Sequence, residues 1–137
     1  MYEKDYILRM IEAFAKMLAA IVGLREKGEL DKARMLVEEA YESILKTDSG
    51  EVKSLDEDQW KQFCSKRSPE ELEMLADLLR VEGEILIDAG KPEGVCRLLF
   101  KALELLRLVE AQSSAFSLTR FDKISHLEEK LSGANYE

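Results

Sequence analysis

Apolar residues recur with helical spacing along most of the chain. Over residues 3–27 they recur every three or four positions, the period of an α-helix that buries one face. The same period returns in four further segments, residues 30–46, 69–89, 92–112 and 117–131. No segment alternates apolar and polar residues between turn signals, as a half-buried strand would. The pattern predicts an all-α fold of five or six helices.

Glycine and proline mark several of the expected helix ends. Gly28 and Gly90 each follow a periodic segment, where the end of a helix favours glycine. Ser68 and Pro69 combine an N-cap residue with proline at the first helical position, and Pro92 is expected to open the next helix. These residues divide the chain into separate helices joined by short turns.

The segment at about residues 47–67 has a weaker pattern. It begins with a cluster of turn residues at 47–50. Ser54 with Glu57 then forms a capping box ahead of Trp60, which predicts one short helix. We interpret the whole segment as an irregular insert between more regular helices.

The last predicted helix completes the fold with one apolar face. Its apolar residues are Phe121, Ile124, Leu127 and Leu131. Residues 133–137 follow it and are expected to fray. The length then suits a single helical domain over residues 1–132.

Two of the predicted helix pairs share one residue spacing. The later pair reads Gly83, Leu86, Gly90, Val95, Leu99 and Ala102, and the earlier pair reads Ile21, Leu24, Gly28, Ala33, Val37 and Ala40. Small residues at such positions let two helices approach closely, and the glycine between them permits a tight antiparallel turn. This spacing resembles the tetratricopeptide repeat. The resemblance implies antiparallel hairpins with right-handed packing and the binding of a protein or peptide.

The sequence departs from that repeat in three respects. The aromatic positions of the motif hold Leu or Val, and Ile21 stands where the first copy should have a small residue. No proline follows the second helix of either pair. Ile21 and Gly83 are also 62 positions apart, against a repeat length of about 34. A regular superhelix is therefore not expected.

The resemblance to the repeat also implies where a partner would bind. The groove of such repeats lies on the first helix of each pair, and the candidate residues here are Arg25, Asp77, Arg80, Glu84 and Asp88. Arg80 and Glu84 are four positions apart, so the alternative is an ion pair on a solvated helix face. Separately, residues 5–12 resemble the start of an uncharacterised bacterial family of short helical proteins, which implies no activity.

The first predicted helix has an unusually wide apolar surface. Met10, Met17 and Leu24 extend its apolar stripe to an arc of roughly 200°, about twice what packing on one side requires. Such a helix must be covered on two sides. One interpretation is that other helices of the same chain supply the cover. The other is self-association into a homodimer through Met10, Met17 and Leu24.

Composition narrows the classes of partner. The chain has 20 Lys and Arg against 28 Asp and Glu, a formal net charge of −8, which disfavours nucleic acid and anionic membranes. The longest apolar run, residues 17–24, is far shorter than the roughly 20 residues of a membrane-spanning helix. The first residues lack the pattern of a signal peptide. We therefore expect a cytoplasmic protein.

The sequence offers little equipment for catalysis. A single histidine, His126, and two cysteines, Cys64 and Cys96, do not form a known metal or nucleophile motif. There is no phosphate-binding glycine loop and no Cys-x-x-Cys pair. We expect no enzyme, no catalytic residue, no cofactor and no metal. The leading hypothesis is a protein-interaction scaffold, and the alternative is a small-molecule-sensing or regulatory domain with an apolar pocket near Trp60.

Overall fold

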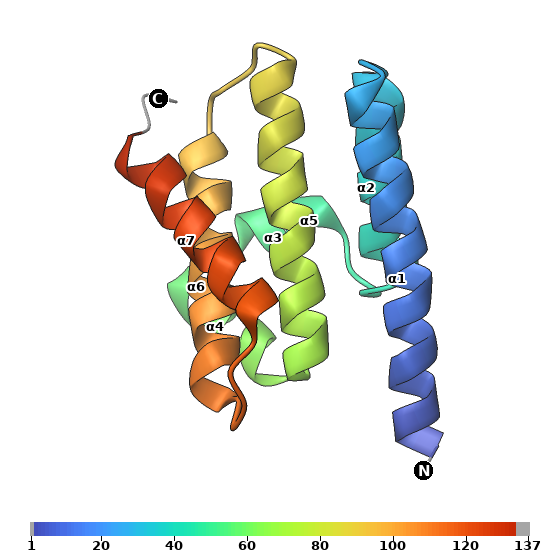
Figure 1. The fold of residues 1–137 in the computed structure, drawn as a ribbon, viewed down its shortest axis with the longest axis vertical. Coiled ribbons are helices and arrows are strands. Elements are labelled where there is room, and N and C mark those ends of the chain that lie inside the picture. Colours follow the sequence, from blue (N-terminus) through green and yellow to red (C-terminus); the bar gives the residue numbers. More distant parts are fainter. Residues whose placement is uncertain (1, 134–137) are drawn as a thin grey trace. The chain divides into compact units, whose positions relative to one another are not determined.

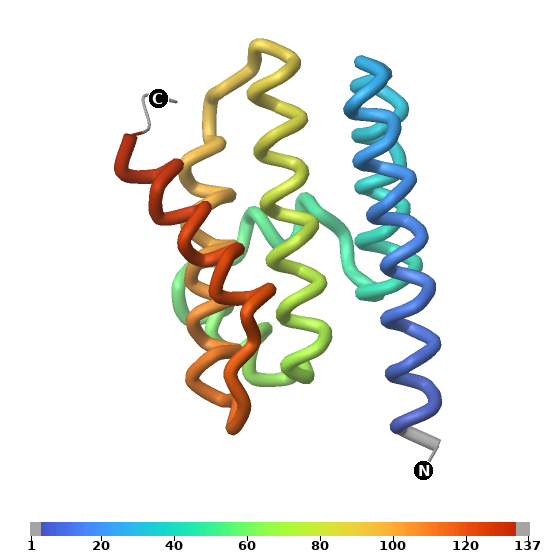
Figure 2. Tube along the Cα trace, viewed as in Figure 1, coloured from blue at the N-terminus to red at the C-terminus, as the bar shows by residue number. Residues whose placement is uncertain are grey.

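The computed structural model describes residues 2–133, with side chains from residue 4 onward (Figures 1 and 2). This part of the chain contains seven helices and no strand: α1 (Tyr2–Glu26), α2 (Leu30–Ser43), α3 (Ser49–Ser54), α4 (Glu57–Ser65), α5 (Pro69–Asp88), α6 (Val95–Gln112) and α7 (Leu118–Ser132). The all-α prediction is confirmed, but the expected count of five or six helices is too low. Most of the tail predicted to fray, residues 134–137, lies outside the described residues.

The chain divides into two compact units, Met1–Glu71 and Leu72–Glu137. Helices α1 to α4 belong to the first unit, and most of α5 belongs with α6 and α7 to the second. None of the described helices combines the length and apolar character that crossing a bilayer requires.

Helices α1 and α2 form an antiparallel hairpin in the first unit (Figure 1). Gly28 turns the chain with a φ of 77°, a left-handed conformation that costs glycine little. Its N–H donates to the carbonyl of Arg25 at 3.0 Å, and the N–H of Glu29 donates to the carbonyl of Leu24 at 2.9 Å. This is a Schellman cap, which satisfies carbonyls that the end of a helix leaves free.

Helices α5 and α6 repeat the same turn in the second unit. Gly90 has a φ of 71°, and its N–H donates to the carbonyl of Ile87 at 3.0 Å. The N–H of Lys91 donates to the carbonyl of Leu86 at 2.9 Å. The predicted C-cap roles of both glycines are confirmed, and the two caps match bond for bond.

Gly83 allows the two helices to approach closely. A Cβ at this position would lie 3.0 Å from Cδ2 of Leu99 and 3.6 Å from Cγ1 of Val95. Leu99 and Val95 are fully buried, so neither side chain has room to move away. The small residue of the shared spacing therefore has a packing role in the second hairpin.

The start of α6 differs from the sequence prediction. Pro92 was expected to open this helix, yet α6 begins at Val95. Gly94, the N-cap, has a φ of 78° and interrupts the helical backbone between the two residues. The carbonyl of Pro92 accepts a hydrogen bond from the N–H of Val95 at 3.1 Å, so the proline forms a turn in front of the helix.

Helix α7 packs against α6 (Figures 1 and 2). The side chain of Ser117 caps it by accepting a hydrogen bond from the N–H of Arg120 at 3.2 Å. Leu127 is fully buried, but Phe121 is 52% exposed. The predicted limits of this helix hold within one residue, whereas the placement of Phe121 on its buried face is wrong.

The segment at 47–67 holds two short helices. Asp48 caps α3, its carboxylate accepting hydrogen bonds from the N–H groups of Gly50 at 2.7 Å and Glu51 at 3.2 Å. The predicted capping box of Ser54 and Glu57 is wrong, because Ser54 is the last residue of α3 and its hydroxyl donates to the Glu51 carbonyl.

The capping box of α4 is formed by Asp56 and Gln59 instead. The Asp56 carboxylate accepts from the N–H of Gln59 at 2.8 Å, and the Gln59 carbonyl oxygen accepts from the N–H of Asp56 at 2.9 Å. The short helix expected around Trp60 is therefore present, although it starts from a different cap.

Candidate functional site

Helix α1 has one apolar row that is buried. Met10 is 8% exposed, Phe14 5% and Ile21 0%. Met17 and Leu24 are half-buried on the same row, and the Ser43 hydroxyl of α2 contacts Sδ of Met17 at 3.6 Å. The structure therefore places Met10, Met17 and Leu24, the residues predicted for self-association, on or beside the inner side of the helix.

A second apolar row on α1 is largely open to solvent. It recurs at spacings of three and four and consists of Leu8, Ile11, Ala15, Leu18 and Val22, called the open stripe below. Leu8 is 50% exposed, Ile11 38% and Val22 39%, and Leu18 is half-buried. An exposed apolar row of this length, next to a buried one, is typical of a helix that receives a partner.

Charged residues border the open stripe along its solvent side. At 100° per residue, Asp5, Glu12 and Glu26 follow the stripe directly, and Arg9 and Lys16 lie one row further round the helix. All of these side chains are exposed. Acidic and basic side chains therefore both border the open stripe, and the exposed Lys4 lies at the same angle as its centre.

Three of the five predicted groove residues lie together on α5. Asp77 pairs with Arg80 on its own helix at 3.0 Å and with Lys123 of α7 at 3.0 Å. Glu84 faces Lys130 of α7 at 4.0 Å. Helix α7 thus lies against this face of α5 and supplies cations to both carboxylates.

The other two predicted groove residues lie at the C-terminal ends of their helices. Asp88 is the last residue of α5 and is exposed, and Arg25 is half-buried in the last turn of α1, in the first unit. The structure brings Asp77, Arg80 and Glu84 together and shows no common groove for all five within either unit.

The contact between α7 and its neighbours is strongly polar. Arg120 donates to Glu110 of α6 at 2.6 Å and to Glu73 of α5 at 3.3 Å. The hydrogen bond to Glu110 is the main reason that the pKa of Arg120 lies above its usual range. Lys123 also reaches Glu73, at 3.4 Å. These ion pairs connect α7 to both α5 and α6, and Arg120 and Lys123 are the better shielded partners.

An aromatic patch lies at the start of α7. Phe116 is 67% exposed, Leu118 65% and Phe121 52%, and the two phenylalanine rings are 5.8 Å apart between centroids. Phe116 and Leu118 are not among the residues predicted from the sequence. Both residues flank the N-cap Ser117, ahead of the periodic part of the helix, and this position could have indicated that they are exposed.

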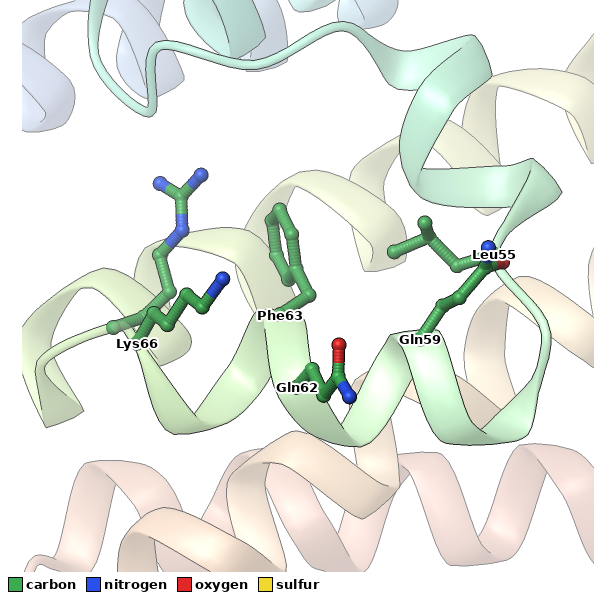
Figure 3. Close-up of a pocket in the computed structure, with 6 residues that line it drawn as sticks. Leu55, Gln59, Gln62, Phe63 and Lys66 are labelled. Atoms are coloured by element: carbon green, nitrogen blue, oxygen red, sulfur yellow. The ribbon is translucent and has the colours of Figure 1, made fainter.

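The pocket of the first unit lies along α4 (Figure 3). It has a volume of about 270 Å³ and is lined by Leu55, Gln59, Gln62, Phe63, Lys66 and Arg67. Trp60 does not line it; this residue is 7% exposed and stacks on Phe63 with centroids 6.0 Å apart. A pocket thus lies near Trp60, but four of its six lining residues are polar, whereas the alternative hypothesis has an apolar one.

The two cysteines and the histidine differ in their exposure to solvent. Cys64 is buried, Cys96 is half-buried, and His126 is exposed. Within residues 2–133, no three His, Cys, Asp or Glu side chains are placed so as to hold a metal ion.

Comparisons with protein families, curated proteins and solved structures found no match to this chain. The resemblances to the tetratricopeptide repeat and to the bacterial family therefore rest on the residues quoted for them.

Proposed function

We propose that the protein is a non-catalytic protein-interaction module of the cytoplasm, and that the open stripe of α1 is its main contact surface. The observation that carries this proposal is the exposure of Leu8, Ile11 and Val22 on a helix whose neighbouring row is already buried. Apolar side chains of this size gain free energy when a partner covers them, at about 25 cal/mol per Å².

The two matching hairpins support packing of the tetratricopeptide type. Ala33, Val37 and Ala40 in α2 are at most 1% exposed, and so are their counterparts in α6: Val95, Leu99 and Ala102. The caps at Gly28 and Gly90 have the same hydrogen bonds. Equal spacing, equal burial and equal C-caps are what two copies of one hairpin would show, although α6 starts three residues later after its cap than α2 does.

The partner we propose is a protein or peptide segment, with self-association into a homodimer as one form of the contact. The net charge of −8 favours a basic or amphipathic segment. The predicted groove on α5 is a weaker surface, since a partner there would compete with Lys123 and Lys130 for the same carboxylates.

Association through the open stripe can be tested with one charged substitution. We expect Leu8→Glu to weaken self-association or capture of a partner by about tenfold, since a half-exposed leucine would leave an apolar contact. The matched control is Met35→Glu on α2, a residue 72% exposed and outside the stripe. Light scattering after gel filtration and crosslinking with mass spectrometry would measure the effect.

The outcomes of this test separate association from folding. Equal association of wild type, Leu8→Glu and Met35→Glu would refute the open stripe as the contact surface. Met17→Glu is unsuitable as a test, because Met17 packs beside Ser43 of α2 and a charge there would disturb the hairpin itself.

A second candidate function is the binding of a small molecule in the α4 pocket. It is favoured by one specific observation, the stacking of buried Trp60 on Phe63, which lines the pocket. A ligand that contacts Phe63 would therefore act on Trp60 in the core of the first unit, as a sensing domain requires.

A further inference from the structure

The lining of the α4 pocket carries positive charge in an acidic protein. Two of its six residues are cations, Lys66 and Arg67, and none is a carboxylate. The chain as a whole has a net charge of −8. A pocket lined by cations and no carboxylate favours anionic ligands over neutral ones of the same shape.

Most of the lining comes from one face of α4 and its cap. Gln59, Gln62, Phe63, Lys66 and Arg67 recur at the spacing of successive helical turns. Figure 3 shows the side chains of Leu55 and Phe63 facing the same space from two segments. The pocket thus has an apolar side and a polar side.

Arg67 has a structural role in this pocket. Its Nη1 donates to the carbonyl of Leu45 at 2.5 Å and lies 3.4 Å from the carboxylate of Glu71. Its guanidinium also lies over the Phe63 ring, with 4.4 Å between Cζ and the ring centroid. These contacts hold Arg67 in place and offset part of its charge.

Lys66 is the cation that remains available to a ligand. Its side chain is exposed, and no ion pair is recorded for it within the described residues. Gln59 uses its carbonyl oxygen to cap α4, which leaves its NH₂ group as a donor, and Gln62 is exposed beside it. The polar side therefore offers donors and a positive charge.

We propose that the α4 pocket binds a small organic carboxylate with a compact apolar or aromatic body. Lys66 pairs with the carboxylate, the glutamine amides donate hydrogen bonds to it, and Leu55 and Phe63 contact the body. A volume of about 270 Å³ is just below the roughly 300–1,000 Å³ of typical ligand sites, which selects a single-ring molecule over a nucleotide. This proposal rests on the second candidate function.

Benzoate and benzamide form a matched pair of probes for the site. They share a ring, but only benzoate carries the charge that Lys66 would bind. We expect benzoate to shift the NMR signals of residues 55–67 and the Trp60 indole N–H in a saturable way, and benzamide to bind at least about threefold more weakly. Equal binding of the two probes, or shifts spread over the whole chain, would overturn the proposal.

Two lysines of the same segment provide the control. Lys66→Gln is expected to lower benzoate affinity about threefold, whereas Lys61→Gln, an exposed α4 residue outside the lining, should leave it unchanged. Equal loss in both variants would mean that only general charge matters and would refute a specific role for Lys66. Cyclohexanecarboxylate distinguishes an aromatic from an aliphatic body.

Benzoate titration of Leu8→Glu tests the carboxylate site independently of the open stripe. Leu8→Glu should bind benzoate as the wild type does, since Leu8 is not part of the pocket lining. Loss of association in Leu8→Glu together with no benzoate binding in the wild type would refute the carboxylate site and leave the interaction module standing.

Discussion

Two glycines, one within α1 and one in the turn after it, show how backbone conformation decides the role of a single residue. Gly28 has a φ of 77°, where a side chain is strained, and a Cβ there would meet no atom within 4 Å. Gly23 lies five positions earlier, inside α1, without a positive φ and also with no atom within 4 Å of an added Cβ. The two positions therefore differ in backbone conformation, and an added Cβ would clash with no atom at either of them.

This difference predicts opposite effects of one substitution. Gly28→Ala should destabilise the protein by about 1–2 kcal/mol, the cost of placing an L-residue in the left-handed region. Gly23→Ala should stabilise it by about 0.5–1 kcal/mol, because alanine is the better helix former. Urea unfolding followed by circular dichroism measures both free energies. A stabilising Gly28→Ala would contradict the assigned cap.

At the level of elements, the sequence predicts helices well where their ends carry local signals. Pro69 opens α5 and Gly90 ends it, both as expected, and the segment predicted from residue 117 begins at a cap, Ser117. Asp48 was assigned to a turn, although it caps α3, because a turn and a six-residue helix share the same residue types. Pro92 does not open α6 as predicted, because Gly94 has a positive φ and interrupts the helical backbone after it.

The candidate surfaces were harder to predict than the helices. The wide apolar arc of α1 is visible in the sequence, but which of its two rows is buried depends on the packing of α2. The same holds for Asp77, whose pairing with Lys123 joins residues 46 positions apart. Helical periodicity predicts which residues share a face of one helix, but it does not predict which other helix packs against that face.

The polar contact of α7 leads to a prediction at the scale of elements. Arg120 is 11% exposed and bonds Glu110 and Glu73, so Arg120→Gln should cost about 1–3 kcal/mol of unfolding free energy. The control is Arg107→Gln, which breaks a pair with Glu128 between side chains about half exposed and should cost at most about 1 kcal/mol. Denaturant unfolding compares the two variants.

Two outcomes would argue against this role of Arg120. Equal costs for Arg120→Gln and Arg107→Gln would mean that burial of the pair does not matter. A cost that disappears in 1 M NaCl would assign the contact to screened surface charge, since exposed pairs weaken with salt much more than shielded ones do.

At the scale of the whole molecule, the boundary between the two compact units falls within one helix. The units meet between Glu71 and Leu72, and α5 runs from Pro69 to Asp88 across that point. Domain boundaries usually fall in exposed linkers with few contacts. The prediction of a single domain over residues 1–132 therefore concerns two compact units that one helix connects along the chain.

Single-domain behaviour can be tested by calorimetry of two core variants. Ile21→Ala in the first unit and Leu99→Ala in the second each remove a fully buried side chain and should cost about 2–5 kcal/mol. If α5 couples the units, the wild type unfolds in one transition and each variant lowers the temperature of that same transition. Two transitions, with Ile21→Ala lowering one of them alone, would show that the units unfold as separate domains. Residues on the open stripe would then belong to an independently stable hairpin, and partner binding there would stabilise only the first unit.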